Sequence, residues 1–414
     1  MRKYRIDGSK PAAEACLFRI KNKISAIAGK LQNFETSNKA REQNEQFTRD
    51  KKQFFRSLFE DSQKVKEPPK KEDIREFWEG KIWGDSNKYA GKPAWLDEVE
   101  KKYRNVKEQD WEQITEANIR NQLGKSMNWK APGHDCIPNY WMKNLPTMHK
   151  HLADAMNICV ECPESMPGWI VKGKTTLLPK TNKTTDASQY RPITCLTTLW
   201  KCLTGIIGDK IATFLNANSI LAEEQQGAVK NSYGTKTQLL INKSILEDAA
   251  RRKKNLHMLY IDYQKAYDSV PHEWIKESLS LYKVCPIIVN FICTSMVMWK
   301  VDLILYYEGG HVKVENVQFR RGIFQGDSLS PLLFIIALNP LSLMINRHCK
   351  GYKIGELWVT HLWYMDDLKG YSDSFANLGK MANLIESMSN DIGMEFGLPK
   401  CQCINMVNGR YRKT

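Results

Sequence analysis

The stretch Tyr364-Met365-Asp366-Asp367 decides the fold of this chain. Apolar residues lie on both sides of the two acids, so the pattern predicts a tight β-hairpin with both carboxylates at its tip. Neighbouring like charges cost free energy unless a cation neutralises them, and a divalent metal ion is the natural partner. An Asp-Asp pair is also common in solvated turns, so the pair alone leaves both interpretations open.

A third acid, Asp262, ends a second apolar segment upstream. Residues 256–261 predict a buried strand, and Pro271 with the amphipathic run after it predicts a helix. Three carboxylates from two strands are enough for two Mg²⁺ ions that share their other ligands with water and substrate phosphates. The alternative, in which Asp262 caps a helix and the other two acids form a polar turn, explains each motif separately but not their combination.

A glycine-containing loop lies between these two motifs. Its residues 325–328 are Gln-Gly-Asp-Ser, followed by Pro331 and an apolar helical pattern up to residue 345. The loop can bring backbone close to a nucleotide, with Gln325 near a base or sugar and Arg320 and Arg321 near phosphates. A glycine turn with an N-cap before a core helix explains the loop when it is taken alone.

Together these segments resemble motifs C, A and B of reverse transcriptases, and most closely those of non-LTR (LINE-type) retrotransposons. Residues 130–135 resemble a segment that those enzymes carry ahead of their fingers. Residues 177–180 and 190–194 resemble their finger motifs. The resemblance runs from about residue 115 to residue 406 in unbroken motif order, which makes it more specific than any single motif.

The resemblance implies a catalytic role for four residues. Asp262 and Asp366 would be the principal metal ligands and Asp367 the third acid, holding two Mg²⁺ ions, with Mn²⁺ as an alternative. Lys400 would occupy the place of a motif D lysine that protonates the leaving pyrophosphate. A lysine near a turn is also commonly just a solvated charge, so that role has a simple alternative.

Five further residues would bind the incoming nucleotide. The resemblance gives the triphosphate to Arg191, helped by Lys180 or, in its place, Lys183. Gln325 and Gly326 would shape the nucleotide pocket. Tyr267 falls where the family keeps a bulky aromatic that excludes a 2′-hydroxyl and so favours deoxynucleotides.

The resemblance also implies an α+β fold, a right-hand polymerase with fingers and palm. We expect an antiparallel palm sheet with helices on one face, a helical N-terminal extension and no thumb. The expected divisions are a basic extension (1–115), fingers (116–255), a palm with motifs A to D (256–406) interleaved with the fingers, and a tail (407–414). The palm sheet should contain residues 256–262, the strands flanking the acidic pair and about 401–406, with helices starting at Pro271, Ser328 and Ser374.

Two segments near the N-terminus have weaker patterns. Residues 39–71 are rich in charged residues and glutamine, with aromatic residues at near-helical spacing. They predict a solvated helix docked by one aromatic face. The resemblance implies a further role, compatible with the first, in which a basic helix grips template RNA ahead of the fingers. Phe77-Trp78 and Ile82-Trp83 predict a pair of amphipathic helices to which we attach no chemistry.

Composition agrees with a polyanionic partner. The chain has 61 basic and 46 acidic residues, a net charge of +15 and a pI near 9.2. No signal peptide or membrane span is visible, and the apolar segment 329–345 is interrupted often enough to predict a core helix. We therefore expect an intracellular protein of the nucleus or cytoplasm that does not bind membranes.

Three functions compete at this stage. The leading one is an RNA-directed DNA polymerase whose partners are an RNA template, a DNA primer and dNTPs. The second is an RNA-dependent RNA polymerase, because Asp262 and Asp268 mimic its two spaced acids, although Tyr267 argues against a ribonucleotide substrate. The third is a decayed or domesticated, truncated copy that binds RNA without synthesis. The eight residues after Met406 hold no thumb, which favours this third interpretation, whereas the intact acids oppose it.

Overall fold

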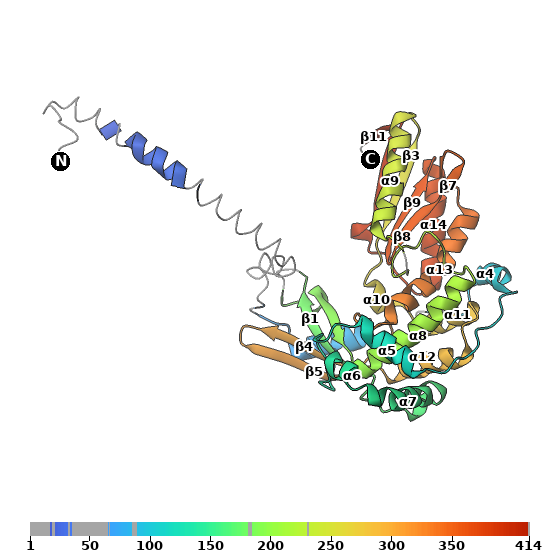
Figure 1. The fold of residues 1–414 in the computed structure, drawn as a ribbon. Helices are drawn as coiled ribbons and strands as arrows, with labels where there is room; N and C mark the ends of the chain where they lie inside the picture. The colour runs from blue at the N-terminus through green and yellow to red at the C-terminus, as the bar shows by residue number, and fades with distance from the viewer. Residues whose placement is uncertain are drawn as a thin grey trace. The chain divides into compact units, whose positions relative to one another are not determined.

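The computed structural model describes residues 17–18, 21–31, 34, 65, 67–84, 89–180, 184–229 and 232–412 (Figure 1). The chain divides into two compact units, Met1–Lys66 and Glu67–Thr414. In the first unit, residues 17–18, 21–31 and 34 are helical and exposed. The aromatic residues predicted to form one helical face between positions 47 and 59 lie outside the described residues. All further observations concern the second unit.

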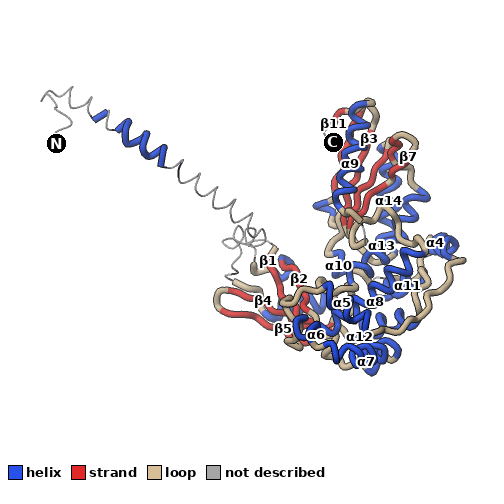
Figure 2. The backbone as a smooth tube through the Cα atoms, in the orientation of Figure 1, coloured by secondary structure: helices blue, strands red, loops and turns tan. Residues whose placement is uncertain are grey.

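The second unit contains two main β-sheets (Figure 2). The first, which we call the fingers sheet, has the order β2-β1-β4-β5, with strands β1 (Gly173–Pro179), β2 (Tyr190–Cys195), β4 (Lys300–Tyr307) and β5 (Gly310–Gln318). The second, the palm sheet, has the order β11-β10-β3-β9-β8, with strands β3 (Leu256–Ile261), β8 (His361–Tyr364), β9 (Asp367–Ser372), β10 (Gln402–Val407) and β11 (Arg410–Arg412). A small hairpin joins β6 (Tyr352–Ile354) to β7 (Leu357–Val359).

The helices of this unit mostly follow the predicted pattern. Those predicted at Pro271, Ser328 and Ser374 are α11 (His272–Leu281), α13 (Ser330–His348) and α14 (Phe375–Asp391). The others are α3 (Lys71–Arg75), the π-helical η1 (Glu76–Ile82), α4 (Leu96–Tyr103), α5 (Glu116–Lys125), α6 (Asn139–Asn144), α7 (His149–Glu161), α8 (Thr198–Ala217), α9 (Thr235–Arg251), α10 (Ala266–Ser269) and α12 (Pro286–Met298). The prediction of an α+β fold is confirmed, and so are the predicted palm strands.

Helices cover both faces of the palm sheet, so the prediction of helices on one face is wrong. Ile245 of α9 packs with Leu256 and Met258 of β3 in one buried cluster. His257, which lies between those two residues and therefore points to the opposite face, meets the ring of Phe375 in α14. The sequence pattern of α9 carried no sign of which face it would cover, because an amphipathic stripe fits either face.

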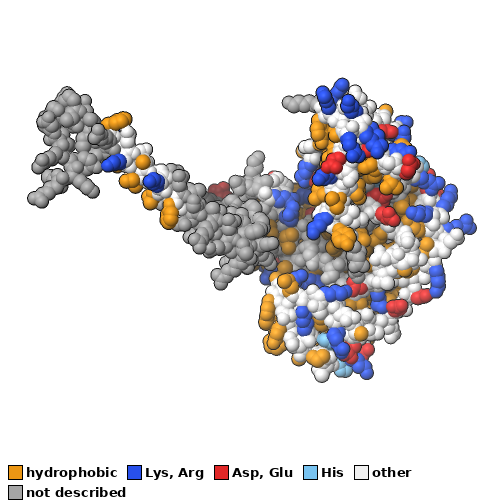
Figure 3. Space-filling view, turned by 45° about the horizontal axis from the view of Figure 1, so that its top comes forward, with side chains coloured by type: hydrophobic (Ala, Val, Ile, Leu, Met, Phe, Trp, Pro, Cys, Tyr) orange, Lys and Arg blue, Asp and Glu red, His pale blue; other side chains and the backbone are white. Residues whose placement is uncertain are grey.

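The apolar segment 329–345 forms α13, with Pro331 in its first turn, where a missing N–H costs no helical hydrogen bond. Among the described helices, α13 is the one long and apolar enough to cross a bilayer, but most of it is buried inside this unit. The prediction of a core helix is therefore confirmed. In Figure 3, lysine and arginine side chains are spread over the visible face of this unit among fewer acidic ones, in keeping with the net charge of +15.

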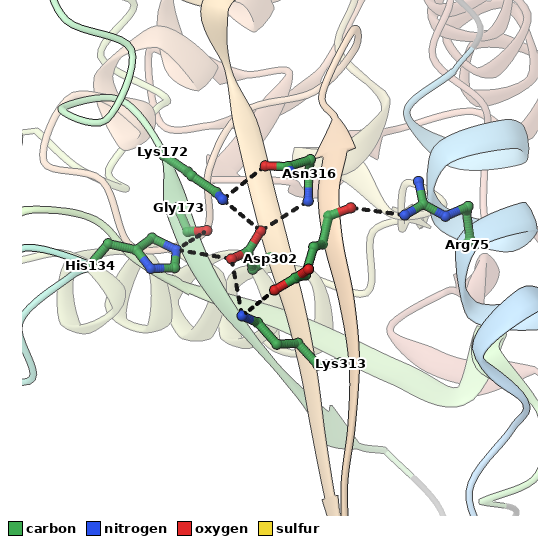
Figure 4. Close-up of polar contacts among 8 residues, drawn as sticks. Arg75, His134, Lys172, Gly173, Asp302, Lys313 and Asn316 are labelled. Carbon is green, nitrogen blue, oxygen red and sulfur yellow. Dashed lines mark hydrogen bonds and ion pairs between the residues drawn. The ribbon is translucent and has the colours of Figure 1, made fainter.

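Asp302 of β4 is the buried centre of a charge cluster in the fingers sheet (Figure 4). Its carboxylate lies 3.0 Å from Lys172 Nζ, 3.7 Å from Lys313 Nζ and 3.7 Å from His134 Nε2, and it accepts the Asn316 N–H at 2.9 Å. Burial opposes ionisation, but these partners outweigh it and hold the pKa of Asp302 below its usual range. The cluster ties β4 and β5 to two segments that precede β1.

Candidate functional site

The acidic hairpin forms as the sequence predicts, with one refinement. Tyr364 of β8 pairs with Asp367 of β9, so Met365 and Asp366 are the two turn residues and Asp367 already belongs to a strand. Met365 has a φ of 56°, whereas Asp366 has no positive φ. A positive φ at only the first turn residue is the signature of a type II′ hairpin, whose twist matches that of the strands.

The palm sheet brings Asp262 to the same place. Ile261 of β3 pairs with Leu368 of β9, so the next step of this antiparallel register sets Asp262 opposite Asp367. Directly opposite residues have their side chains on one face, with Cβ atoms about 5 Å apart. Asp262 and Asp367 also line one cavity of about 640 Å³ together with Lys400 and with the first turns of α9.

The carboxylates of this site repel one another. Burial raises the pKa of Asp366, and the neighbouring charges of Asp367 and Asp262 raise it further. Burial and the charge of Asp262 likewise raise the pKa of Asp367. The nearest opposing charge is the ammonium of Lys400, which lies 2.9 Å from Asp262 Oδ2 and 3.3 Å from Oδ1. Among the described residues, Lys400 is the cation in direct contact with this group of acids.

A divalent metal ion suits this donor set. Carboxylate oxygens are the ligands that Mg²⁺ prefers, and a bound cation would offset both the burial and the mutual repulsion that raise the pKa values of Asp366 and Asp367. Within the described ranges, however, no three His, Cys, Asp or Glu side chains lie close enough together to hold an ion as they stand. Lys400 occupies the position of a cation at Asp262, so metal binding would require this ammonium to move.

The segment that carries Lys400 is fitted closely around Asp262. The Gly397 N–H donates to the Asp262 carbonyl oxygen at 2.7 Å. A Cβ added to Gly397 would lie 2.8 Å from Asp262 Oδ2, which real Cβ contacts almost never show. A side chain at position 397 would displace the Asp262 carboxylate, so Gly397 belongs to the site, although its own sequence neighbourhood gave it no role.

Gln225 is a second residue that the sequence analysis missed. Its buried amide accepts the Met365 N–H at 3.0 Å and donates to the Met365 carbonyl oxygen at 3.3 Å. It also accepts the Gly227 N–H at 2.8 Å. Gln225 thereby holds the strained positive-φ residue at the hairpin tip. No local pattern could have revealed this, because Gln225 and Met365 are 140 positions apart.

Tyr267, which follows Asp262 closely in sequence, is the aromatic residue predicted to exclude a 2′-hydroxyl, a role called a steric gate. The ring of Tyr267 stacks on Phe334 of α13, with centroids 4.8 Å apart and planes 15° apart. Burial raises the pKa of Tyr267, and the charge of Asp366 adds to the effect. The phenol is therefore neutral and lies within the field of the acidic site. Its packing on α13 fixes the ring plane, as a steric gate requires.

Gln325 and Gly326 are held against both the palm and the fingers sheet. The Gln325 side-chain amide donates to Asp268 Oδ2 at 3.3 Å. The backbone carbonyl oxygen of Gln325 accepts the Thr194 N–H of β2 at 2.9 Å. Gly326 has a φ of +131°, and a Cβ there would lie 2.3 Å from the Thr194 carbonyl oxygen. Glycine is thus required at position 326 by the close approach of the loop to β2.

Lys180 and Arg191 flank the turn between β1 and β2. Leu178 pairs with Arg191, and the Lys180 N–H donates to the Gln189 carbonyl oxygen at 2.7 Å, so both basic residues lie near the turn end of this hairpin. Burial lowers the pKa of Lys180, while the charges of Asp268 and Asp262 oppose that change. The field of the palm acids therefore reaches Lys180, although no direct bond joins them among the described side chains.

The role considered for Arg321 is wrong. Its buried guanidinium donates to the backbone carbonyl oxygens of Ser269 and Gly393, which makes it an internal brace and not a phosphate contact. Arg320 is exposed. Adjacent arginines look alike in sequence, and only the fold separates the one that points inward.

Comparison with known proteins matches this arrangement to one family. A family model described as "Reverse transcriptase (RNA-dependent DNA polymerase)" matches residues 178–411. The chain is 25% identical over 292 residues to the "Retrovirus-related Pol polyprotein from type-1 retrotransposable element R2" of Nasonia vitripennis, which covers 68% of this chain and 26% of that protein. It is 24% identical over 308 residues to the "RNA-directed DNA polymerase from mobile element jockey" of Drosophila melanogaster, covering 71% and 32%. The chain thus spans about a quarter to a third of the length of these relatives.

Proposed function

Because this chain belongs to the reverse transcriptase (RNA-dependent DNA polymerase) family, we propose that it extends a DNA primer with dNTPs on an RNA template. We further propose that it does so for a non-LTR retrotransposon, in the nucleus or cytoplasm, since its relatives include proteins of the R2 and jockey elements. The observation that carries the proposal is the placement of Asp262, Asp366 and Asp367 together at the end of the palm sheet, where burial and mutual repulsion raise the pKa values of Asp366 and Asp367.

The three carboxylates would hold the metal ions, for which we propose Mg²⁺. Such ions would supply Lewis-acid stabilisation of the charge that develops during phosphoryl transfer. Lys180 and Arg191 would bind the triphosphate as it enters from the side of the fingers sheet. The Lys400 ammonium, once released from Asp262, would be free to give a proton to the leaving pyrophosphate.

Selection of the sugar would rest on Tyr267, whose ring is fixed by Phe334. The alternative of an RNA-dependent RNA polymerase rests on a second acid in motif A that is available to a substrate. Here that acid, Asp268, is only 3% exposed and is already bonded to Trp83 and Gln325. Both observations favour deoxynucleotides over ribonucleotides.

The test is primer extension by the purified full chain on an RNA template annealed to a DNA primer. We expect extension with dNTPs and Mg²⁺, little extension with NTPs, and none with EDTA or in the Asp262→Asn variant. A preference for NTPs would replace the proposal with an RNA polymerase. RNA retention in a filter-binding assay without extension under any condition would replace it with an RNA-binding function.

A further inference from the structure

The segment from Lys71 to Gly84 runs alongside β5 and ends beside the motif A turn. Arg75 donates to the Glu315 carbonyl oxygen at 2.8 Å, and Glu79 accepts the Gln318 N–H at 3.2 Å. The Arg320 N–H donates to the Trp83 carbonyl oxygen at 3.0 Å. These contacts fix the position of Trp83, which is buried. The sequence pattern of this segment suggested amphipathic helices without any chemistry.

Trp83 is connected to Gln325 through one carboxylate, that of Asp268. Its indole N–H donates to Asp268 Oδ1 at 3.2 Å, and the Gln325 side-chain amide donates to Asp268 Oδ2 at 3.3 Å. Each oxygen of this buried acid thus receives one donor. Because one N–H of the Gln325 amide is held by Asp268, the plane of this amide is set by that bond, and its second N–H and its oxygen Oε1 are the atoms that can contact a ligand.

The surroundings of Asp268 leave it little freedom. A Cβ at Gly322 would lie 2.7 Å from the Asp268 carbonyl oxygen, so the chain that leads to Gln325 passes directly against this residue. The Gly322 N–H also donates to the Val270 carbonyl oxygen at 2.8 Å. A carboxylate fixed in this way transmits a change at one of its oxygens to the donor on the other.

We propose that Trp83 is a positioning residue of the nucleotide site, which acts through Asp268 to orient the Gln325 amide toward the incoming dNTP. This inference rests on the proposed function, because it takes Gln325 as a nucleotide contact. It makes Trp83, at the end of this segment, a part of the polymerase site, whereas sequence gave it no role. Loss of the indole N–H frees the Asp268 carboxylate to shift and the Gln325 amide to turn.

The test uses Trp83→Phe, which removes the N–H but keeps an aromatic ring. Trp78→Phe is the matched control, because Trp78 lies in the same segment, is equally buried and has an indole N–H without a hydrogen-bond partner among the described residues. We expect Trp83→Phe to raise the KM for dNTP roughly threefold to tenfold, as loss of a bond to a charged acceptor commonly does, with a smaller change in kcat. Trp78→Phe should leave the KM unchanged.

A double mutant separates positioning from stability. In the Gln325→Ala background, Trp83→Phe should raise the KM no further, since the residue on which it acts is gone. Full additivity of the two changes would overturn the proposal, as would equal KM values for Trp83→Phe and the wild type. A purely structural role would lower the melting temperature of Trp83→Phe and Trp78→Phe alike and leave both KM values as in the wild type.

Asp268→Asn provides a second variant if Trp83→Phe does not fold. Its amide can still accept from Trp83 but presents N–H₂ to Gln325, so Gln325 must turn and the KM should rise. If the wild type adds no nucleotide, the proposed function fails, and the shift in melting temperature caused by dNTP with Mg²⁺ then decides the inference alone. That shift should be smaller in Trp83→Phe than in Trp78→Phe, and equal shifts would overturn it.

Discussion

The charges around the aspartates differ between the two sheets of this protein, being mainly positive in the fingers sheet and mainly negative in the palm sheet. In the fingers sheet, Asp302 has two lysines and a histidine within 4 Å and a pKa below its usual range. In the palm sheet, three aspartates share Lys400, and the pKa values of Asp366 and Asp367 are raised. Both arrangements use aspartates at β-strands, so residue type and secondary structure alone do not separate them.

The charge balance separates them. The Asp302 cluster is complete without a ligand, because its cations outweigh the cost of burying the carboxylate. The palm cluster is incomplete, because each added negative charge raises the cost of the others until a cation binds. A balanced cluster of this kind stabilises a fold, and an unbalanced one marks a site that binds something.

The largest effect should come from the palm. Asp262→Asn or Asp366→Asn removes a metal-ligand charge but keeps the side-chain volume, so nucleotide addition should fall by at least about a thousandfold. Stability should hold or rise, because a like charge is lost, and RNA binding should stay nearly intact. Primer extension, thermal unfolding and filter binding measure the three quantities. Polymerisation retained in either variant would refute the metal-ligand assignment.

Tyr267 combines a site property with a packing property. It lies in the field of the palm acids, and its ring is also packed on Phe334. Tyr267→Ala should raise ribonucleotide incorporation relative to deoxynucleotide incorporation by roughly a hundredfold, since overlap with a 2′-hydroxyl costs a few kcal/mol. Tyr267→Phe is the control: it keeps the ring and should keep the selectivity. A lower melting temperature of Tyr267→Ala with an unchanged dNTP-to-NTP ratio would mean that the ring only packs.

In the fingers sheet we expect the opposite outcome, a loss of stability with little loss of activity. Asp302→Asn leaves Lys172, Lys313 and His134 beside a neutral amide, and it should lower the free energy of unfolding by roughly 1–3 kcal/mol, less than for a fully buried pair because the lysines are partly exposed. Urea unfolding measures this loss. Extension activity per folded molecule should remain near that of the wild type. An activity loss as large as that of Asp262→Asn would break the distinction between the two sheets.

Sequence was sufficient for the palm but not for what surrounds it. The strand that ends at Asp262 and the hairpin at Asp366 are local patterns, and their motif order fixed the fold class. Gln225 and Trp83 act on residues 140 and 185 positions away, and nothing in their own neighbourhood marks those partners. The side chains around Asp302 come from three separate segments, so the charge balance appears only after folding.

Asp327, a buried acid whose carboxylate accepts hydrogen bonds from uncharged groups, extends the comparison to the pH dependence of stability. Burial raises the pKa of Asp327 to about 6, although its carboxylate accepts hydrogen bonds from Thr204 and Ser328. The folded chain therefore binds a proton more tightly than the unfolded chain, whose aspartate titrates near its usual value of about 3.9. Stability from this group is fully present below about pH 4 and is lost as the pH rises through 6. Asp302, with its lowered pKa, loses stability in the opposite direction, as the pH falls below about 4.

Asp327→Asn removes this titration. The changed hydrogen bonds of the variant add a contribution that does not depend on pH. Between pH 5 and pH 7.5, the free energy of unfolding of Asp327→Asn relative to the wild type should therefore rise by roughly 1 kcal/mol. Urea unfolding at several pH values measures the slope, and Asp302→Asn should show no such drift over this range, because the pKa of Asp302 lies below it. A difference for Asp327→Asn that is independent of pH would show that the carboxyl group titrates normally despite its burial. In that case burial alone would not explain the raised pKa values of the palm acids, and repulsion among them would have to account for more of the effect.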